Sequence, residues 1–336
     1  MKIETNHNIE KSSFAFQKII LIVGIILFAV KLSAWFLTGS VAIYSDAMES
    51  IVNVVSAFLG LYSLYLSTKP KDFNHPYGHG KIEFLSSAVE GILIAIAGII
   101  IIIEATQSIF DAHIPHQMDY GIALVAFSAL CNSLLGVYAL KKGKKNKSLA
   151  LRSSGKHLLT DTYSTIGIII GLILIYITKI AWLDSAVAII FAFVILKTAY
   201  DIIKESVSGI MDEADETLIK EIVIFLQEKR IPNWIDLHNM RIIKYGSKLH
   251  MDVHMTLPYF LTVKEAHYEM ENLDKLVNSY FGDRVELFIH TDPCQPFSCT
   301  ICTKKDCELR QNSFKAQIEW NIANVSQNNK HQIADE

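Results

Sequence analysis

Long apolar stretches occupy the first two thirds of the chain and limit the folds that it can adopt. Six stretches each exceed the roughly 20 residues that a helix needs to cross the hydrocarbon of a bilayer. They are Phe16–Phe36, Val41–Leu66, Ile82–Phe110, Tyr120–Leu140, Leu149–Thr178 and Trp182–Ile203. Hydrophobic residues make up 51% of the 336 residues and charged residues only 19%, a balance that favours a polytopic membrane protein. We therefore expect an all-α membrane domain of six transmembrane helices over residues 1–208.

The lysines between these stretches predict the orientation of the helices. Lysines precede the first stretch and follow the second and the fourth, whereas the opposite loops contain only Lys179. By the positive-inside rule, both termini should lie on the cytoplasmic side of the inner (cytoplasmic) membrane. The densest group of lysines, at 141–147, is best interpreted as part of this topology signal. We therefore expect a lipid bilayer, and no nucleic acid, as a partner.

From about Gly209 charges become frequent and the hydrophobic pattern alternates between helical and strand periods. Residues 209–295 should form a small cytoplasmic α+β domain of order αββαβ, with its helices on one face of the sheet. The predicted elements are a helix at Asp215–Arg230, strands at Leu237–Tyr245 and Lys248–Leu257, a helix at Val263–Tyr280 and a strand at Val285–His290. Residues 296–336 should form a cysteine-containing tail, disordered beyond about Phe314.

Charged and polar residues inside the apolar stretches are the first candidate site. Asp46, Glu49 and Asn53 share one face of the second stretch, and His157 and Asp161 lie one turn apart in the fifth. Ionisable groups at bilayer depth are costly and mark functional sites by default. The alternative is that these polar residues only hold neighbouring helices together through hydrogen bonds. Glu49, Asn53, His157 and Asp161 could supply four donors to one divalent metal ion, and Asp46 could add another.

A second candidate lies in the loop after the second stretch. Asp72, His75 and His79 surround Pro76 there, and the proline argues against a regular helix through the loop. Two histidines with a nearby carboxylate favour a Zn²⁺-like ion. A hydrogen-bonded turn is the alternative interpretation.

Histidines are concentrated in the predicted soluble domain. With one carboxylate they form the set His238, His250, His254, His267, His290 and Asp292. Strand periodicity places His250 and His254 on one face, and His290 and Asp292 on a shared face of the last strand. Any single histidine could be incidental, but together with Asp292 they indicate a metal site.

Four cysteines follow the last predicted strand. Cys294, Cys299, Cys302 and Cys307 include a CxxC pair, which is a good chelate for Zn²⁺ or a softer metal. The cysteines could instead pair as disulfides. Because the cytoplasm is reducing, free thiols or a bound metal are favoured.

Four motifs together resemble the cation diffusion facilitator (cation efflux) family. They are TGSVAIYSDAMES at 38–50, HPYGHGKIE at 75–83, HLLTD at 157–161 and IHTDPC at 289–294. The resemblance runs from about Lys18 to Cys294. It implies a homodimeric antiporter that exports divalent metal ions in exchange for protons, with six spans and a cytoplasmic, metallochaperone-like domain.

The resemblance also implies roles for individual residues. The transport site would be Glu49, Asn53, His157 and Asp161, and the loop site Asp72, His75 and His79. The cytoplasmic, dimer-bridging zinc sites would be His238, His254, His267, His290 and Asp292. Lys81 and Asp212 would form a charge interlock in the dimer.

This chain departs from the family at one ligand pair. Zinc exporters usually carry His or Asp, then Asp, where this chain has Glu49 and Asn53. An amide oxygen is neutral and harder than imidazole, so Fe²⁺, Co²⁺, Cd²⁺ and Mn²⁺ become candidates besides Zn²⁺.

Two other classes of function compete with transport. A membrane metallohydrolase would need an activated water, a general base and an oxyanion partner, and the sequence contains no HExxH motif. We therefore expect no enzyme. A membrane-anchored metal sensor would use the histidines of the soluble domain but would leave the intramembrane set without a role.

Overall fold

The computed structural model describes residues 3–38, 41–108, 118–146, 148–178, 182–246, 248–282 and 284–333. Within these ranges the side chains of some helical residues, including Glu49, are not described. The chain divides into two compact units, residues 3–211 and residues 212–336, and each is considered by itself.

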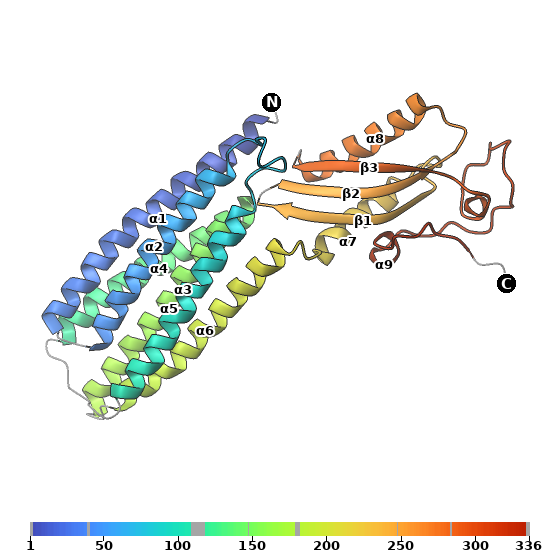
Figure 1. Cartoon of the computed structure of the whole chain (residues 1–336). Coiled ribbons are helices and arrows are strands. Elements are labelled where there is room, and N and C mark those ends of the chain that lie inside the picture. Colours follow the sequence, from blue (N-terminus) through green and yellow to red (C-terminus); the bar gives the residue numbers. More distant parts are fainter. Residues whose placement is uncertain are drawn as a thin grey trace. The chain divides into compact units, whose positions relative to one another are not determined.

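The first unit is built from long helices (Figure 1). They are α1 (Ile3–Thr38), α2 (Val41–Ser67), α3 (Ile82–Ser108), α4 (Met118–Asn146), α5 (Leu149–Thr178) and α6 (Trp182–Ile210). Within the unit α1 packs on α2, α3 on α6 and α4 on α5.

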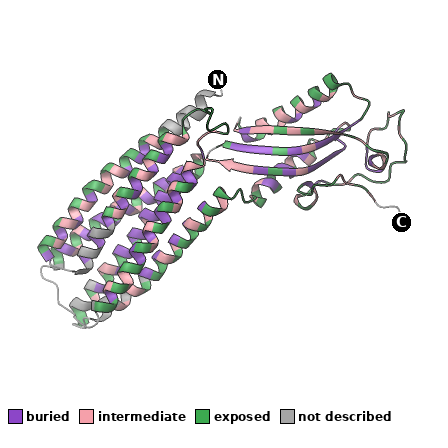
Figure 2. Ribbon diagram, viewed as in Figure 1, coloured by how far each residue is buried: buried purple, intermediate pink, exposed green. Residues whose placement is uncertain are grey.

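Many residues along the helices of this unit are exposed (Figure 2), and large apolar residues are common among them. Large exposed examples include Phe36, Leu134 and Ile177. Among the described residues, four helical stretches are long and apolar enough to cross a membrane: Ser12–Thr38, Ser50–Ser67, Ile82–Gln107 and Asp119–Asn146. The apolar surface and these four stretches indicate a multi-pass membrane protein. The number of six spans stays a prediction.

Helices α4 and α5 approach each other closely at glycines. A Cβ atom added to Gly155 would lie 2.8 Å from the backbone nitrogen of Leu140 and 3.1 Å from the carbonyl oxygen of Gly136. One added to Gly143 would lie 2.8 Å from the nitrogen of Arg152. Small residues allow such backbone contacts in membrane helices. This contact holds the first turns of α5 against α4. In the predicted orientation, these turns lie at the cytoplasmic end of the helix.

The second unit follows the predicted order αββαβ. Its elements are α7 (Glu216–Glu228), β1 (Asp236–Tyr245), β2 (Lys248–Leu257), α8 (Val263–Phe281) and β3 (Val285–Pro293), followed by a 3-10 turn η1 (Pro296–Thr300) and a short helix α9 (Ile322–Val325). Strand β2 lies in the centre, antiparallel to β1 and parallel to β3. The sheet confirms the predicted small α+β domain.

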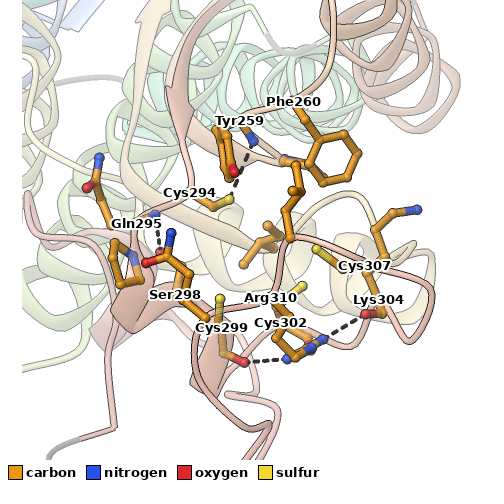
Figure 3. Close-up of a pocket in the computed structure, with 15 residues that line it drawn as sticks. Tyr259, Phe260, Cys294, Gln295, Ser298, Cys299, Cys302, Lys304, Cys307 and Arg310 are labelled. Atoms are coloured by element: carbon orange, nitrogen blue, oxygen red, sulfur yellow. Dashed lines mark hydrogen bonds between the residues drawn. The ribbon is translucent and has the colours of Figure 1, made fainter.

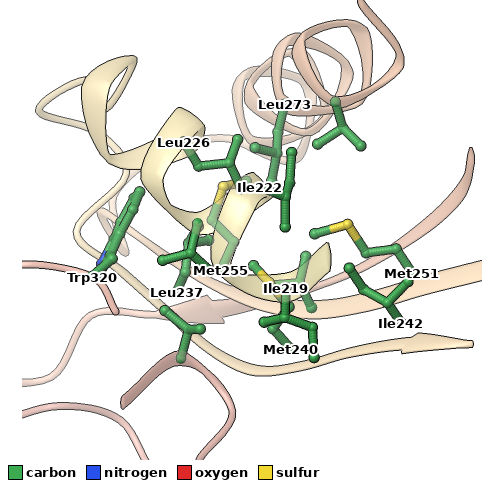
Figure 4. Packing of buried hydrophobic residues seen from close by; sticks show 14 of the residues in the cluster. Ile219, Ile222, Leu226, Leu237, Met240, Ile242, Met251, Met255, Leu273 and Trp320 are labelled. Carbon is green, nitrogen blue, oxygen red and sulfur yellow. The ribbon is translucent and has the colours of Figure 1, made fainter. Parts of the chain in front are cut away.

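Two helices and one face of the sheet enclose the core of this unit (Figure 4). Ile222 and Leu226 of α7 and Leu273 of α8 meet Met251 and Met255 of β2 there, and all five are fully buried. Since side chains alternate along a strand, the even-numbered residues of β2 and β3 lie on the opposite face. That face carries the histidines of these strands.

An irregularity in β1 brings a third histidine to the same face. The register between β1 and β2 shifts between His238 and Arg241, and Asn239 adopts a positive φ of 51°. Such a bulge inserts one residue and reverses the alternation that follows. Leu237 before the bulge and Met240 after it are therefore both in the core, while His238 lies opposite His254 in the ladder.

The tail after Phe314 contradicts the predicted disorder. Trp320 and Val325 are buried in the core of the second unit, and the guanidinium of Arg230 lies 4.1 Å from the Trp320 ring centroid. The backbone nitrogen of Trp320 also donates to Gln227 Oε1 at 3.1 Å. These two apolar anchors order an otherwise polar segment, which composition alone did not reveal.

Candidate metal centres

Three predicted ligands of the membrane site meet between α2 and α5. Both polar atoms of the Asn53 side chain are engaged: Oδ1 bonds with Nε2 of His157, and Nδ2 donates to Oδ2 of Asp161. Nε2 of His157 lies 3.9 Å from Oδ1 of Asp161. All three residues are buried. The side chain of the fourth predicted ligand, Glu49, lies outside the described residues.

Two ligand atoms in this site lack a hydrogen-bond partner among the described residues. They are Nδ1 of His157 and Oδ1 of Asp161, both buried. Because the amide oxygen of Asn53 only accepts hydrogen bonds, Nε2 of His157 carries the proton and Nδ1 presents its lone pair. Buried polar atoms are rarely left unsatisfied in proteins. Each of these two atoms could therefore serve as a ligand to a cation.

Asp46 is held in a buried ion pair one helical turn from the Glu49 position. Its Oδ1 accepts from Nζ of Lys31 at 2.8 Å and from Oγ1 of Thr165 at 3.1 Å. Lys31 and Asp46 are each only 1% exposed. The ammonium of Lys31 therefore pairs directly with the carboxylate of Asp46.

A further carboxylate, Glu90 of α3, lies beside the same site. Its Oε2 accepts a hydrogen bond from Ser153 of α5, and its Oε1 has no partner among the described residues. Glu90 interacts electrostatically with both His157 and Asp161. The site thus borders α3 as well as α2 and α5.

The predicted loop site is also assembled. Nδ1 of His75 lies 2.9 Å from Oδ1 of Asp72, and Nε2 of His79 lies 3.4 Å from Oδ2. The hydrogen bond with His75 holds the pKa of Asp72 below its ordinary value. One ligand atom from each residue lies within 4.8 Å of the others. The set can hold a metal ion. The bonds between Asp72 and His75 also close a turn, so the alternative interpretation of a hydrogen-bonded turn stays open.

In the second unit, His238, His254 and Asp292 form a cluster on the sheet face away from the core. Oδ2 of Asp292 lies 3.4 Å from Nε2 of His238 and 3.2 Å from Nδ1 of His254. The ring of His290, the ladder partner of His254, is centred 4.5 Å from that of His254. Nδ2 of Asn239, from the bulge, lies 3.0 Å from Nε2 of His254. Adjacent strands thus bring the row of ligands together.

The ordered tail returns to this cluster. Nζ of Lys330 lies 3.2 Å from Oδ1 of Asp292 and donates to the carbonyl of Pro293 at 3.1 Å. Burial tends to raise the pKa of Asp292, but the bond from Lys330 and its charge hold it below the ordinary value. An ammonium therefore already neutralises the carboxylate of the cluster.

His331 bonds to a second buried carboxylate next to the cluster. Its backbone nitrogen donates to Oδ2 of Asp236 at 3.0 Å, and its Nδ1 contacts Oδ1. Nδ1 of His238 lies 3.4 Å from Oδ2 of the same carboxylate. Burial raises the pKa of Asp236, but the bonds from His238 and His331 dominate and lower it to about 2. The bond to Asp236 in turn raises the pKa of His331.

Other predicted site residues lie apart from these clusters. His267 is 68% exposed on α8 and lies 3.6 Å from Glu271. His250 is buried, with Nδ1 3.2 Å from Glu286. Lys81 belongs to the first unit and Asp212 to the second, so their charge interlock stays a prediction.

The structure adds residues that the sequence analysis missed. Lys31 and Glu90 are isolated charges within predicted spans, and the cost of burying charge in a bilayer would have singled out both. Lys330 and Asp236 carry no comparable signal, because their roles depend on contacts between distant segments.

Two family models match the chain. The cation efflux transmembrane domain matches residues 18–211, and the cytoplasmic domain of cation efflux proteins matches residues 212–294. An uncharacterised transporter of Synechocystis is 30% identical over 266 residues, covering 79% of this chain and 85% of the relative. The manganese efflux system protein MneP of Bacillus subtilis is 30% identical over 287 residues, covering 82% of this chain and 94% of the relative. The cation-efflux pump FieF of Pectobacterium atrosepticum is 23% identical over 277 residues, covering 81% of this chain and 89% of the relative.

Long apolar helices that bury histidine and carboxylate side chains, followed by a small sheet domain, define a multi-pass membrane protein. The two family models match the helical unit and the sheet domain in the same order. The chain belongs to the cation diffusion facilitator, or cation efflux, family, a family of transporters.

Proposed function

We propose that this protein exports divalent transition-metal cations across the cytoplasmic membrane in exchange for protons. It would act as a homodimer with six spans per chain and with both termini in the cytoplasm. The observation that carries the proposal is the meeting of Asn53, His157 and Asp161 between α2 and α5, where two buried ligand atoms lack a partner among the described residues. Glu49 would complete the set.

The donors of this set bear on the choice of metal. With Glu49 included, three ligands offer oxygen and one offers an imidazole nitrogen, and oxygen-rich sites suit harder ions such as Mn²⁺. A relative named for manganese efflux supports Mn²⁺ as one substrate. Zn²⁺ should still bind, because it ranks above Mn²⁺ and Fe²⁺ at most nitrogen and oxygen sites.

Transport is tested by metal flux into proteoliposomes. Asp161→Ala and His157→Ala should each reduce flux to the background rate, because each removes one of the proposed ligands. Asp119→Ala removes an exposed carboxylate at the start of α4 and should transport like the wild type. Wild-type flux in either ligand variant would remove the site from the transport pathway.

Proton exchange is tested by the pH dependence of metal binding. A metal binds imidazole only when the imidazole is neutral, and carboxylates only when they are ionised. Metal affinity should therefore weaken as the pH falls from about 7.5 to about 5.5, the range in which histidines commonly titrate. An affinity that does not change with pH would refute the antiport.

A membrane-anchored metal sensor is the second candidate, and the cluster His238, His254 and Asp292 favours it. We propose instead that metal at this cluster, with His290, tightens the dimer by bridging two protomers. A sensor would bind metal at the sheet and show no flux in proteoliposomes. An exporter would show both.

A further inference from the structure

Four cysteines surround a cavity in the second unit, away from the sites described above (Figure 3). Cys294 follows β3, Cys299 lies in η1, and Cys302 and Cys307 lie in the loop after it. All four line one cavity of about 40 Å³, and all are free thiols. The matched family domain ends at residue 294, so three of these cysteines lie beyond it.

The backbone around the cavity is fixed by hydrogen bonds. The guanidinium of Arg310 donates to the carbonyls of Cys299 at 2.8 Å, Cys302 at 3.0 Å and Lys304 at 2.7 Å. The amide of Tyr259 donates to Sγ of Cys294 at 3.4 Å, as amides do to metal-bound sulfur. A loop closed in this way can present several sulfurs to one point.

The four cysteines line the same cavity, and cations accompany them. Burial raises the pKa of the Cys294 thiol, the amide of Tyr259 opposes this, and the other three cysteines raise the pKa further. Arg310 and Lys304 also line the cavity. Four thiolates and one divalent ion would carry two negative charges, which Arg310 can offset in part, whereas Lys304 is itself paired with Asp306 at 3.3 Å.

The space suits one ion. A cavity of about 40 Å³ exceeds the roughly 15 Å³ that a single water requires. Sulfurs around Zn²⁺ lie about 2.3 Å from the metal and so about 3.8 Å from one another. The four sulfurs are not gathered as tightly as the ligand atoms of the two clusters above, which lie within 4.8 Å. Binding therefore requires the four sulfurs to come closer together than they are in this structure.

We propose that Cys294, Cys299, Cys302 and Cys307 bind one thiophilic divalent cation, for which Zn²⁺ is the best match, and that this ion secures the tail to the end of β3. The domain matched by the family model is a cytoplasmic one, where disulfides do not persist. The tail so secured contains the segment with Trp320 and Lys330. The site is structural and separate from the transported metal.

The first test titrates Co²⁺ into purified full-length protein under reducing conditions. The protein carries Asp72→Ala, Asp161→Ala and Asp292→Ala, each of which removes a ligand of one of the other three sites. One Co²⁺ per chain should give the intense charge-transfer absorption of thiolate ligation, and Zn²⁺ should abolish it. Absence of this absorption would overturn the proposal, whether or not the wild type transports metal.

Single variants identify the ligands. Cys307→Ser, at a partly exposed position, should reduce the Co²⁺ affinity at least tenfold, and so should the more buried Cys302→Ser. Cys131→Ser, in α4, removes the one cysteine outside the cluster and should leave the spectrum unchanged. Equal spectra and affinities for all three variants would refute the assignment.

Thiol reactivity gives an independent measurement that needs no variant. Zn²⁺ should protect the four clustered cysteines from maleimide, and peptide mass spectrometry should locate this protection. Protection that is absent, or disulfides among the four after purification under reducing conditions, would contradict a metal site.

Discussion

Nζ of Lys330 lies 3.2 Å from Oδ1 of Asp292, so a lysine of the tail forms an ion pair with the carboxylate of the cluster on the sheet. A metal ion must compete with this ammonium for the same negative charge. Lys330 is thus positioned to lower the metal affinity of His238, His254 and Asp292.

Lys330→Gln should raise the metal affinity of this cluster about fivefold, since a partly exposed ion pair contributes up to about 1 kcal/mol. The affinity is measured by calorimetry on full-length Asp161→Ala protein, with Asp292→Ala identifying the heat from this cluster. Lys305→Gln removes an exposed lysine of the same tail and should change nothing. Unchanged or weaker binding in Lys330→Gln would show that the ammonium does not compete.

Asn53→Asp should bind Zn²⁺ more tightly and lose relatively more transport of Fe²⁺, Co²⁺, Cd²⁺ and Mn²⁺. The added carboxylate increases the negative charge of the site and slows release. The measurement is a competition assay among the five ions in proteoliposomes.

The control for Asn53→Asp concerns Asp46. Removing Asp46 alone would leave Lys31 buried beside no carboxylate, so the clean variant is Lys31→Met with Asp46→Asn. If Asn53→Asp alters neither affinity nor selectivity while the double variant abolishes binding, Asp46 is the ligand and Asn53 is not.

The contact between Asp236 and His331 should make docking of the tail depend on pH. Asp236 has its pKa lowered from 3.8 to about 2, so its contribution is present above about pH 4 and is lost as the pH falls towards 2. His331 has its pKa raised above 6.5, so its contribution is present below that pH and is lost as the pH rises through the folded value. Docking should be strongest between about pH 4 and 6.5.

Hydrogen exchange of the peptide containing His331 measures this docking in the absence of metal. The shift at Asp236 corresponds to about 2 kcal/mol, and Asp236→Asn should remove both the protection and its pH dependence. Asp306→Asn, at an exposed carboxylate of the tail, is the control. A pH profile that Asp236→Asn does not flatten would assign the protection to other contacts.

Gly155→Ala should destabilise the protein by about 1–3 kcal/mol, the usual cost of overpacking. The new methyl group would lie 2.8 Å from the nitrogen of Leu140, and backbone cannot move aside as a side chain can. Gly24→Ala is the matched control, because its nearest neighbour is Cγ2 of Val54 at 3.9 Å. Thermal unfolding in detergent compares the two, and equal midpoints would mean that α4 and α5 tolerate separation.

Much of this architecture could be predicted from local patterns. The spacing of His157 and Asp161 within an apolar stretch indicated the membrane site, and strand periodicity placed His290 and Asp292 on one face of the last strand. These signals depend on neighbours in sequence or on repeating geometry.

The remainder depends on contacts that sequence spacing does not reveal. The bulge at Asn239 determines the face that His238 occupies, and the strand pattern gave no sign of it. The tail was mistaken for a disordered segment because Trp320 and Val325 are isolated apolar residues in a polar stretch. Lys31 could have been found, since a lone lysine in an apolar span requires a partner.

The backbone contact between α4 and α5 couples these two helices. Because no side chains separate them at Gly155 and Gly143, we expect them to move as one pair. His157 and Asp161 then travel together with α4, whereas Asn53 belongs to α2. Any movement of α2 relative to this pair would break the bonds of Asn53 to His157 and Asp161.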